Sequence, residues 1–101
     1  MTAFAFKTDY SKLKTTHKTG AASELIVCAD LIRKGYEVYR NVCPVGAADL
    51  IAEKDGKLHH VEVRSCRLLT ADGRPTGFSN KHRADILAVV FNLQVFYFPH
   101  L

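Results

Sequence analysis

Residues 49–64 read DLIAEKDGKLHHVEVR, and this stretch decides how the chain folds. Its Asp55-Gly56 pair predicts a two-residue hairpin turn, because a primed turn needs positive φ and Asp-Gly supplies it. Counting outward from that turn places Asp49 directly opposite Glu62. Their Cβ atoms would then lie about 4.5–5.5 Å apart on one face of the sheet. Arg64 shares that face, because successive side chains of a strand alternate between its two faces.

This hairpin face has two interpretations. Facing carboxylates repel unless a cation compensates, and a divalent ion such as Mg²⁺ binds carboxylate oxygens. The alternative is a solvated surface on which Arg64 pairs with Glu62 and nothing binds. The hairpin by itself leaves both open. The opposite face is apolar and predicts packing against a core through Leu50, Ala52, Val61 and Val63.

The composition is that of one folded domain covering residues 1–101, with 48% hydrophobic and 24% charged residues. We expect no membrane association, because no apolar run reaches the roughly 20 residues that a membrane-spanning helix needs. The first residues also lack the pattern of a secretory signal. The three cysteines are widely spaced and form no C-x-x-C pair, which indicates reduced thiols in a cytoplasmic protein and disfavours a zinc site.

Hydrophobic periodicity predicts one helix and five strands. The helix covers 16–34 and ends at Gly35, a typical C-terminal cap. Strands are expected over 36–42, 47–54, 57–67, 85–91 and 94–98, and the continuous apolar run at 85–91 is typical of a strand covered on both faces. Residues 1–15 would form a basic arm, 68–79 a loop, and 80–84 a short helix or loop. This order predicts a compact α/β domain on a mixed sheet. The apolar stripe expected on the helix consists of Ala22, Leu25, Ile26, Ala29 and Ile32.

Basic residues flank the acidic candidates. Residues 1–20 hold four lysines against one aspartate, and residues 64–83 hold five basic residues against one aspartate. A basic surface around an acidic centre suits a polyanion that must reach a metal ion. An ordinary solvated surface is the alternative.

These elements resemble the PD-(D/E)XK nuclease superfamily, particularly its small members related to Holliday-junction resolvases and homing endonucleases. The family pattern is a helix with a glutamate, an aspartate at the head of a strand, and (D/E)-x-K on the next strand. Here TGAASE at 19–24 matches the helix element, VGAADLI at 45–51 the aspartate element, and EVRS at 62–65 the third. Ala48 stands where proline often does. The resemblance covers about residues 18–99 and implies a restriction-endonuclease-like core.

By this resemblance, Asp49, Glu62 and the backbone carbonyl of Val63 would bind Mg²⁺ or Mn²⁺, while Glu24 would orient a ligand or a metal-bound water. The implied reaction is metal-assisted hydrolysis of DNA phosphodiesters, in which the metal lowers the pKa of bound water and offsets charge on phosphate oxygens. The implied catalytic residues are Glu24, Asp49, Glu62 and Arg64.

Arg64 departs from the family pattern, which has lysine at this position. Arginine stays protonated, with a pKa above about 12, so it cannot act as a general base. It can still hold a phosphate oxygen through its planar guanidinium. Two functions therefore remain open: an active Mg-dependent endodeoxyribonuclease that uses Arg64 electrostatically, or a catalytically impaired module that binds DNA. Lys81 is the candidate replacement for the missing lysine, with a simple phosphate contact as the alternative.

DNA is the expected partner. The residues expected to contact it are Lys18, Arg67, Lys81 and Arg83. We also expect a homodimer, because cutting both strands of a duplex requires two active sites. A third possibility is a structural partner protein that dimerises through an aromatic C-terminal strand containing Phe96, Tyr97 and Phe98.

Overall fold

The computed structural model describes residues 16–43, 46 and 48–101, so the predicted basic arm at 1–15 lies outside the described residues. The predicted helix and five strands are confirmed to within a few residues at each end. Residues 68–79 form a small hairpin instead of a plain loop, and 80–84 are irregular, without a helical turn. The elements are α1 (Thr16–Arg33), β1 (Glu37–Arg40), β2 (Leu50–Lys54), β3 (Lys57–Ser65), β4 (Leu68–Leu69), β5 (Pro75–Thr76), β6 (Ile86–Phe91) and β7 (Gln94–Phe98).

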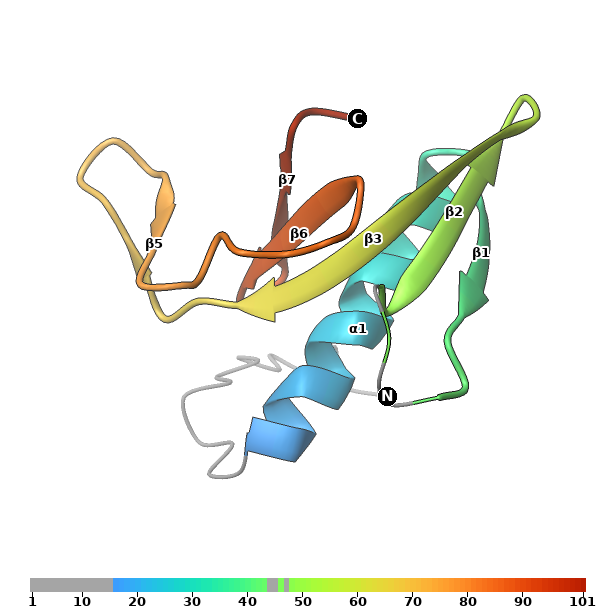
Figure 1. The fold of residues 1–101 in the computed structure, drawn as a ribbon. Coiled ribbons are helices and arrows are strands. Elements are labelled where there is room, and N and C mark those ends of the chain that lie inside the picture. The colour runs from blue at the N-terminus through green and yellow to red at the C-terminus, as the bar shows by residue number, and fades with distance from the viewer. Residues whose placement is uncertain (1–15, 44–45, 47) are drawn as a thin grey trace, which may run out of the picture.

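The five longer strands form one mixed sheet in the order β1-β2-β3-β6-β7. Neighbouring strands are antiparallel except for β3 and β6, which run parallel. A parallel pair cannot be joined by a tight turn, so the chain makes an excursion through the β4–β5 hairpin before it returns as β6. Figure 1 shows this hairpin projecting beyond the end of β3, while α1 lies against the sheet. The predicted α/β class with a mixed sheet is confirmed.

The β2–β3 hairpin has the predicted register. Asp55 and Gly56 adopt positive φ values of 53° and 78°, as a primed turn requires. The ladder then runs from the Lys54–Lys57 pair to the Leu50–Val61 pair. Leu50 is the residue directly after Asp49. The backbone N–H of Asp49 continues this pairing by donating to the carbonyl of Val61 at 2.9 Å. Local turn chemistry therefore places Asp49 beside Glu62 without help from distant contacts.

The helix packs on the sheet through a different stripe from the predicted one. Ser23, Val27 and Leu31 are 4%, 0% and 0% exposed, whereas Leu25 and Ile32 are 57% and 60% exposed. The prediction was wrong for three of its five members, because apolar residues occur on most sides of this helix and periodicity alone does not select the buried face. Of the remaining predicted members, Ala22 and Ile26 are half-buried and Ala29 is exposed.

Strand β6 joins two apolar clusters on opposite faces of the sheet. Five of its six residues are buried, which confirms the prediction of a strand covered on both faces. Leu87 and Val89 pack with Cys66 on the face away from α1, and Phe78 covers them from the excursion. The main core lies between α1 and the sheet and consists of Val27, Leu31, Leu50, Ala52, Val61, Ile86, Ala88, Val90 and Tyr97.

The C-terminal end of α1 is capped as predicted. Gly35 has a φ of 91°, and the N–H of Tyr36 donates to the carbonyl of Leu31 at 3.0 Å. The ammonium group of Lys54 also donates to the carbonyl of Lys34 at 3.0 Å. Because Lys54 lies next to the hairpin turn, these contacts fix the helix end relative to the hairpin. Within the described residues, no helix is long and apolar enough to cross a membrane.

The C-terminal strand is less available to a partner than its aromatic sequence indicates. Tyr97 is 8% exposed, and its hydroxyl donates to Asp30 of α1 at 2.5 Å. Burial and this hydrogen bond raise the pKa of the Tyr97 phenol. Phe98 is 39% exposed and stacks on Phe78, with ring centroids 6.0 Å apart. Tyr97 therefore belongs to the core, whereas Phe98 keeps an exposed part of its side chain.

Asp85 ties the start of β6 to β3 and should make stability depend on pH. Its carboxylate accepts the backbone N–H of His60 at 2.8 Å. Hydrogen bonding from His60 lowers the pKa of Asp85 from its ordinary value of 3.8. A lowered folded-state pKa means that the carboxylate stabilises the fold above the ordinary value and loses this effect as pH falls through the folded pKa. Asp85→Asn should therefore lower the free energy of unfolding at pH 7 more than at pH 2.5. Urea titrations at both pH values measure this difference, and an equal loss at both would contradict it.

Candidate active site

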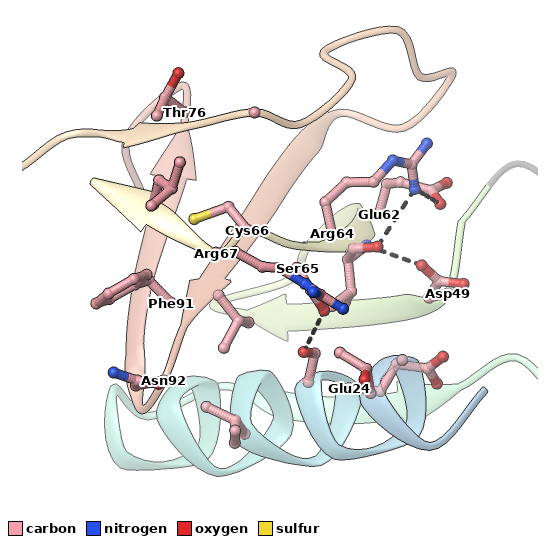
Figure 2. A pocket seen from close by; sticks show the side chains of 18 residues that line it. Glu24, Asp49, Glu62, Arg64, Ser65, Cys66, Arg67, Thr76, Phe91 and Asn92 are labelled. Carbon is pink, nitrogen blue, oxygen red and sulfur yellow. Dashed lines mark hydrogen bonds and ion pairs between the residues drawn. The ribbon is translucent and has the colours of Figure 1, made fainter. Parts of the chain in front are cut away.

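The predicted acidic residues line one cleft of about 680 Å³. Asp49 lies just before β2, Glu62 and Arg64 lie on β3, and Glu24 comes from α1. Figure 2 shows the three carboxylates and Arg64 gathered toward the same end of this cleft. The structure thus brings together side chains from three segments of the chain. Their role in metal binding stays a prediction.

Asp49 is held in place by the strand that carries the other candidate residues. One of its carboxylate oxygens, Oδ2, accepts the backbone N–H of Val63 at 2.8 Å. A carboxylate has about four lone-pair sites, so this bond leaves capacity for a cation. The same peptide region also offers the Val63 carbonyl, the third oxygen of the predicted metal set.

The guanidinium of Arg64 is hydrogen-bonded to two candidate metal ligands, the Glu62 carboxylate and the Val63 carbonyl. Its Nη1 atom donates to Oε2 of Glu62 and, at 3.3 Å, to the carbonyl of Val63. Its Nη2 atom donates to the carbonyl of Lys81 at 3.3 Å. The side chains of Glu62 and Arg64 are only 18% and 30% exposed. The ion pair expected for a solvated face is therefore present, but it lies largely buried inside the cleft.

Glu24 lines the cleft but pairs with a residue that the sequence did not indicate. Its Oε1 atom is 3.5 Å from Nη2 of Arg40, and the Glu24 side chain is 29% exposed. In the part of the chain that the structure describes, no three His, Cys, Asp or Glu side chains group closely enough to hold a metal. The predicted set of Asp49, Glu62 and a backbone carbonyl contains only two such side chains. Glu24 lines the same cleft as that set, and its role stays a prediction.

A hydrogen bond between two serines joins the helix to the site strand. The hydroxyls of Ser23 and Ser65 lie 2.6 Å apart, and Ser23 is 4% exposed. Each serine adjoins a candidate residue, Glu24 in the helix and Arg64 in β3. This contact therefore sets the distance between two parts of the site. The only sequence signal was a small polar residue, Ser23, next to Glu24 on the helix.

A second hollow of about 490 Å³ adjoins the cleft and is mostly basic. Glu62 and Arg64 line both, and Lys81, His82 and Arg83 complete the basic wall together with Gly46. Within the described residues, Nδ1 of His82 is buried without a hydrogen-bond partner. Sequence reasoning missed His82, although it stands between the two basic residues predicted to contact DNA.

The four residues predicted to contact DNA do not all lie together. Lys81 and Arg83 line the second hollow, and Arg67 lines the main cleft. Lys18 is exposed in the first turns of α1 and lines neither. Three of the four thus border the candidate site.

Comparison with known proteins identifies the class to which this fold and site belong. Residues 14–85 match the PD-(D/E)XK endonuclease family, so the chain belongs to that family. Protein 5.3 of Escherichia phage T7 is 34% identical over 92 residues, which cover 81% of this chain and 78% of the relative. A bacterial homing endonuclease, I-Ssp6803I, has a similar fold, with a TM-score of 0.60 and 16% identity over 76% of this chain. The chain spans 62% of that structure's length. The superfamily predicted from the sequence is confirmed, and such nucleases generally use divalent metals.

Proposed function

We propose that this protein is a metal-dependent DNA endonuclease that hydrolyses phosphodiester bonds in the cleft of Asp49 and Glu62. The observation that carries this proposal is the convergence of two carboxylates and the Val63 carbonyl at one end of the cleft. Hard divalent cations such as Mg²⁺ and Mn²⁺ prefer these oxygen ligands. The Arg64 guanidinium is already hydrogen-bonded to the Glu62 carboxylate and the Val63 carbonyl. This contact supports the view that these two oxygens attract positive charge.

Each residue of the cleft has a role in the proposed reaction. Asp49 and Glu62 would hold the ion together with the Val63 carbonyl, and the bound ion would supply an acidified water and charge neutralisation at the phosphate. Glu24, anchored by Arg40 and by the adjacent serine pair, would orient that water from the helix side. Arg64 would hold a phosphate oxygen, because a guanidinium binds phosphate strongly while remaining protonated.

DNA is the proposed substrate, and a homodimer is the proposed assembly. Lys81 and Arg83 line a hollow that shares Glu62 and Arg64 with the cleft, so a backbone phosphate there would neighbour the reacting one. Contacts of this kind make affinity fall steeply with salt. Two copies would provide one active site for each strand of a duplex.

The pairing of Arg64 with Glu62 also favours a second candidate, a DNA-binding module that does not cut. If the guanidinium stays on the metal ligands, no ion binds and no phosphodiester is hydrolysed. This candidate predicts salt-dependent DNA binding that survives Asp49→Ala and Glu62→Ala. Metal-dependent cleavage, or loss of binding in those variants, would exclude it.

A cleavage assay tests the leading proposal. Purified protein is incubated with supercoiled, branched and single-stranded DNA in Mg²⁺, Mn²⁺ or EDTA. We expect nicked or linear products from at least one substrate in the presence of metal and none in EDTA. The proposal fails if no substrate is cut under any metal and Asp49→Ala leaves the affinity for Mn²⁺ unchanged.

A further inference from the structure

Three hydrogen bonds hold the Arg64 guanidinium in one particular place. Two of them go to Glu62 and to the Val63 carbonyl, and the third goes to the Lys81 carbonyl on the excursion between β3 and β6. The first two acceptors are also two of the three oxygen ligands in the proposed metal site. Arg64 is therefore bound to the atoms that an incoming divalent ion would need.

We propose that Arg64 is an intramolecular competitor of the metal ion, so that its guanidinium and a divalent cation exclude each other at Glu62 and the Val63 carbonyl. This inference rests on the proposed function, because it assumes that Asp49 and Glu62 bind metal. It assigns Arg64 a second role besides holding phosphate. In the metal-free protein it neutralises Glu62 and keeps the site closed to weakly binding ions.

Charge makes the Arg64 guanidinium and a divalent cation mutually exclusive at Glu62. The carboxylate of Glu62 belongs to a side chain that is 18% exposed, so water screens its neighbours only partly. Two cations that share its oxygen would repel each other strongly in such surroundings. An unpaired Glu62 would in turn be costly to bury, which is why one of the two must be present. The structure therefore favours exchange of one cation for the other.

The second hollow gives the displaced guanidinium a place to go. Arg64 already lines that hollow and donates to the Lys81 carbonyl there. A shift toward the Lys81 carbonyl would release Glu62 while it keeps Arg64 near the phosphates of bound DNA. Metal binding would then move Arg64 from a metal-ligand atom to a phosphate-binding position. A motif lysine has a single ammonium group and cannot bond to three carbonyl and carboxylate acceptors spread over two hollows in the same planar way.

Calorimetric titration with Mn²⁺ in the absence of DNA tests the competition. The variant Arg64→Met keeps an unbranched apolar stem but removes the guanidinium. It should lower the Kd for Mn²⁺ about fivefold to tenfold, since removal of the ion pair leaves Glu62 available. Arg33→Met is the matched control, because Arg33 is an exposed arginine at the end of α1 that lines neither the cleft nor the second hollow. It removes the same charge and should change Kd by less than about twofold, since solvent and salt screen exposed charges.

A second measurement uses the unaltered protein and stays informative if Arg64→Met fails to fold. Nitrogen-15 NMR of the arginine side chains reports how tightly each guanidinium is held. We expect the Nε–Hε signal of Arg64 to shift and to exchange faster with water when diamagnetic Mg²⁺ is added. The change in the Arg64 signal should depend on Mg²⁺ concentration in the same way as the change in the carboxyl carbon-13 signal of Glu62.

The outcomes separate this inference from the proposed function. Equal Mn²⁺ affinities of Arg64→Met and Arg33→Met would overturn the competition and leave the metal site intact. So would an Arg64 signal that does not change while added Mg²⁺ shifts the Glu62 signal. Failure of both the unaltered protein and Arg64→Met to bind Mn²⁺ would overturn the metal site and the competition together.

Discussion

Replacement of Asp49 by asparagine should reduce metal-dependent DNA cleavage at least about 100-fold, since loss of a charged ligand removes several kcal/mol of electrostatic stabilisation. Asparagine has almost the same shape as aspartate, and its carbonyl oxygen can still accept the N–H of Val63 that Asp49 accepts at 2.8 Å. The fold should therefore survive while the affinity for Mn²⁺ falls. Initial rates of plasmid nicking and a Mn²⁺ titration measure the two effects.

The control for this prediction is Glu53→Gln. Glu53 is also an acidic residue of the β2–β3 hairpin, but it does not line the cleft, and its carboxylate accepts a hydrogen bond from the Tyr39 hydroxyl at 3.5 Å. The same charge is removed only four residues along the chain, but away from the cleft, so the cleavage rate should stay within about twofold. Nicking by Asp49→Asn at the rate of the unaltered protein would contradict the assignment of Asp49 as a metal ligand.

The location of the candidate site was predictable because local geometry brings Asp49 beside Glu62. The positive φ values of Asp55 and Gly56 set the register of β2 against β3, and this register alone carries Asp49 to Glu62. A contact that depends on one turn needs no knowledge of the tertiary structure. The same argument explains why the opposite, apolar face of the hairpin was assigned correctly to the core.

The partners of the site residues were not predictable in the same way. The pairing of Glu24 with Arg40 joins α1 to β1, and it depends on how the helix crosses the sheet. The bond from Arg64 to the Lys81 carbonyl depends on the path of the excursion between β3 and β6. Neither contact follows from spacing along the chain, because each joins elements whose relative position is set by core packing.

The buried face of α1 was also not predictable from the spacing of residues along the chain. Leu31 and Ile32 are neighbours of similar size, and the expected stripe included Ile32 and not Leu31. In the structure Leu31 is fully buried, whereas Ile32 is 60% exposed. Helical periodicity predicts that a helix has a buried face, but on a helix with apolar residues on most sides only the sheet selects which face it is.

A pair of substitutions turns this difference into a measurable effect. Leu31→Ala should lower the free energy of unfolding by about 2–5 kcal/mol, because it leaves a cavity between α1 and the sheet. Ile32→Ala should change it by less than about 0.5 kcal/mol, because the side chain is largely solvated and alanine favours the helix. Urea titrations at pH 7 measure both values, and the larger loss should lower Tm by roughly 10 °C or more in a domain of this size.

The comparison of these two variants also tests whether the site depends on the helix packing. Leu31 holds the helix that carries Ser23 and Glu24, so partial loosening in Leu31→Ala should weaken cleavage even at temperatures where the protein remains folded. Ile32→Ala should retain full cleavage, because it leaves the helix–sheet contact intact. Equal destabilisation by the two substitutions would show that the Ile32 face is covered in solution, and α1 would then have a second packing partner.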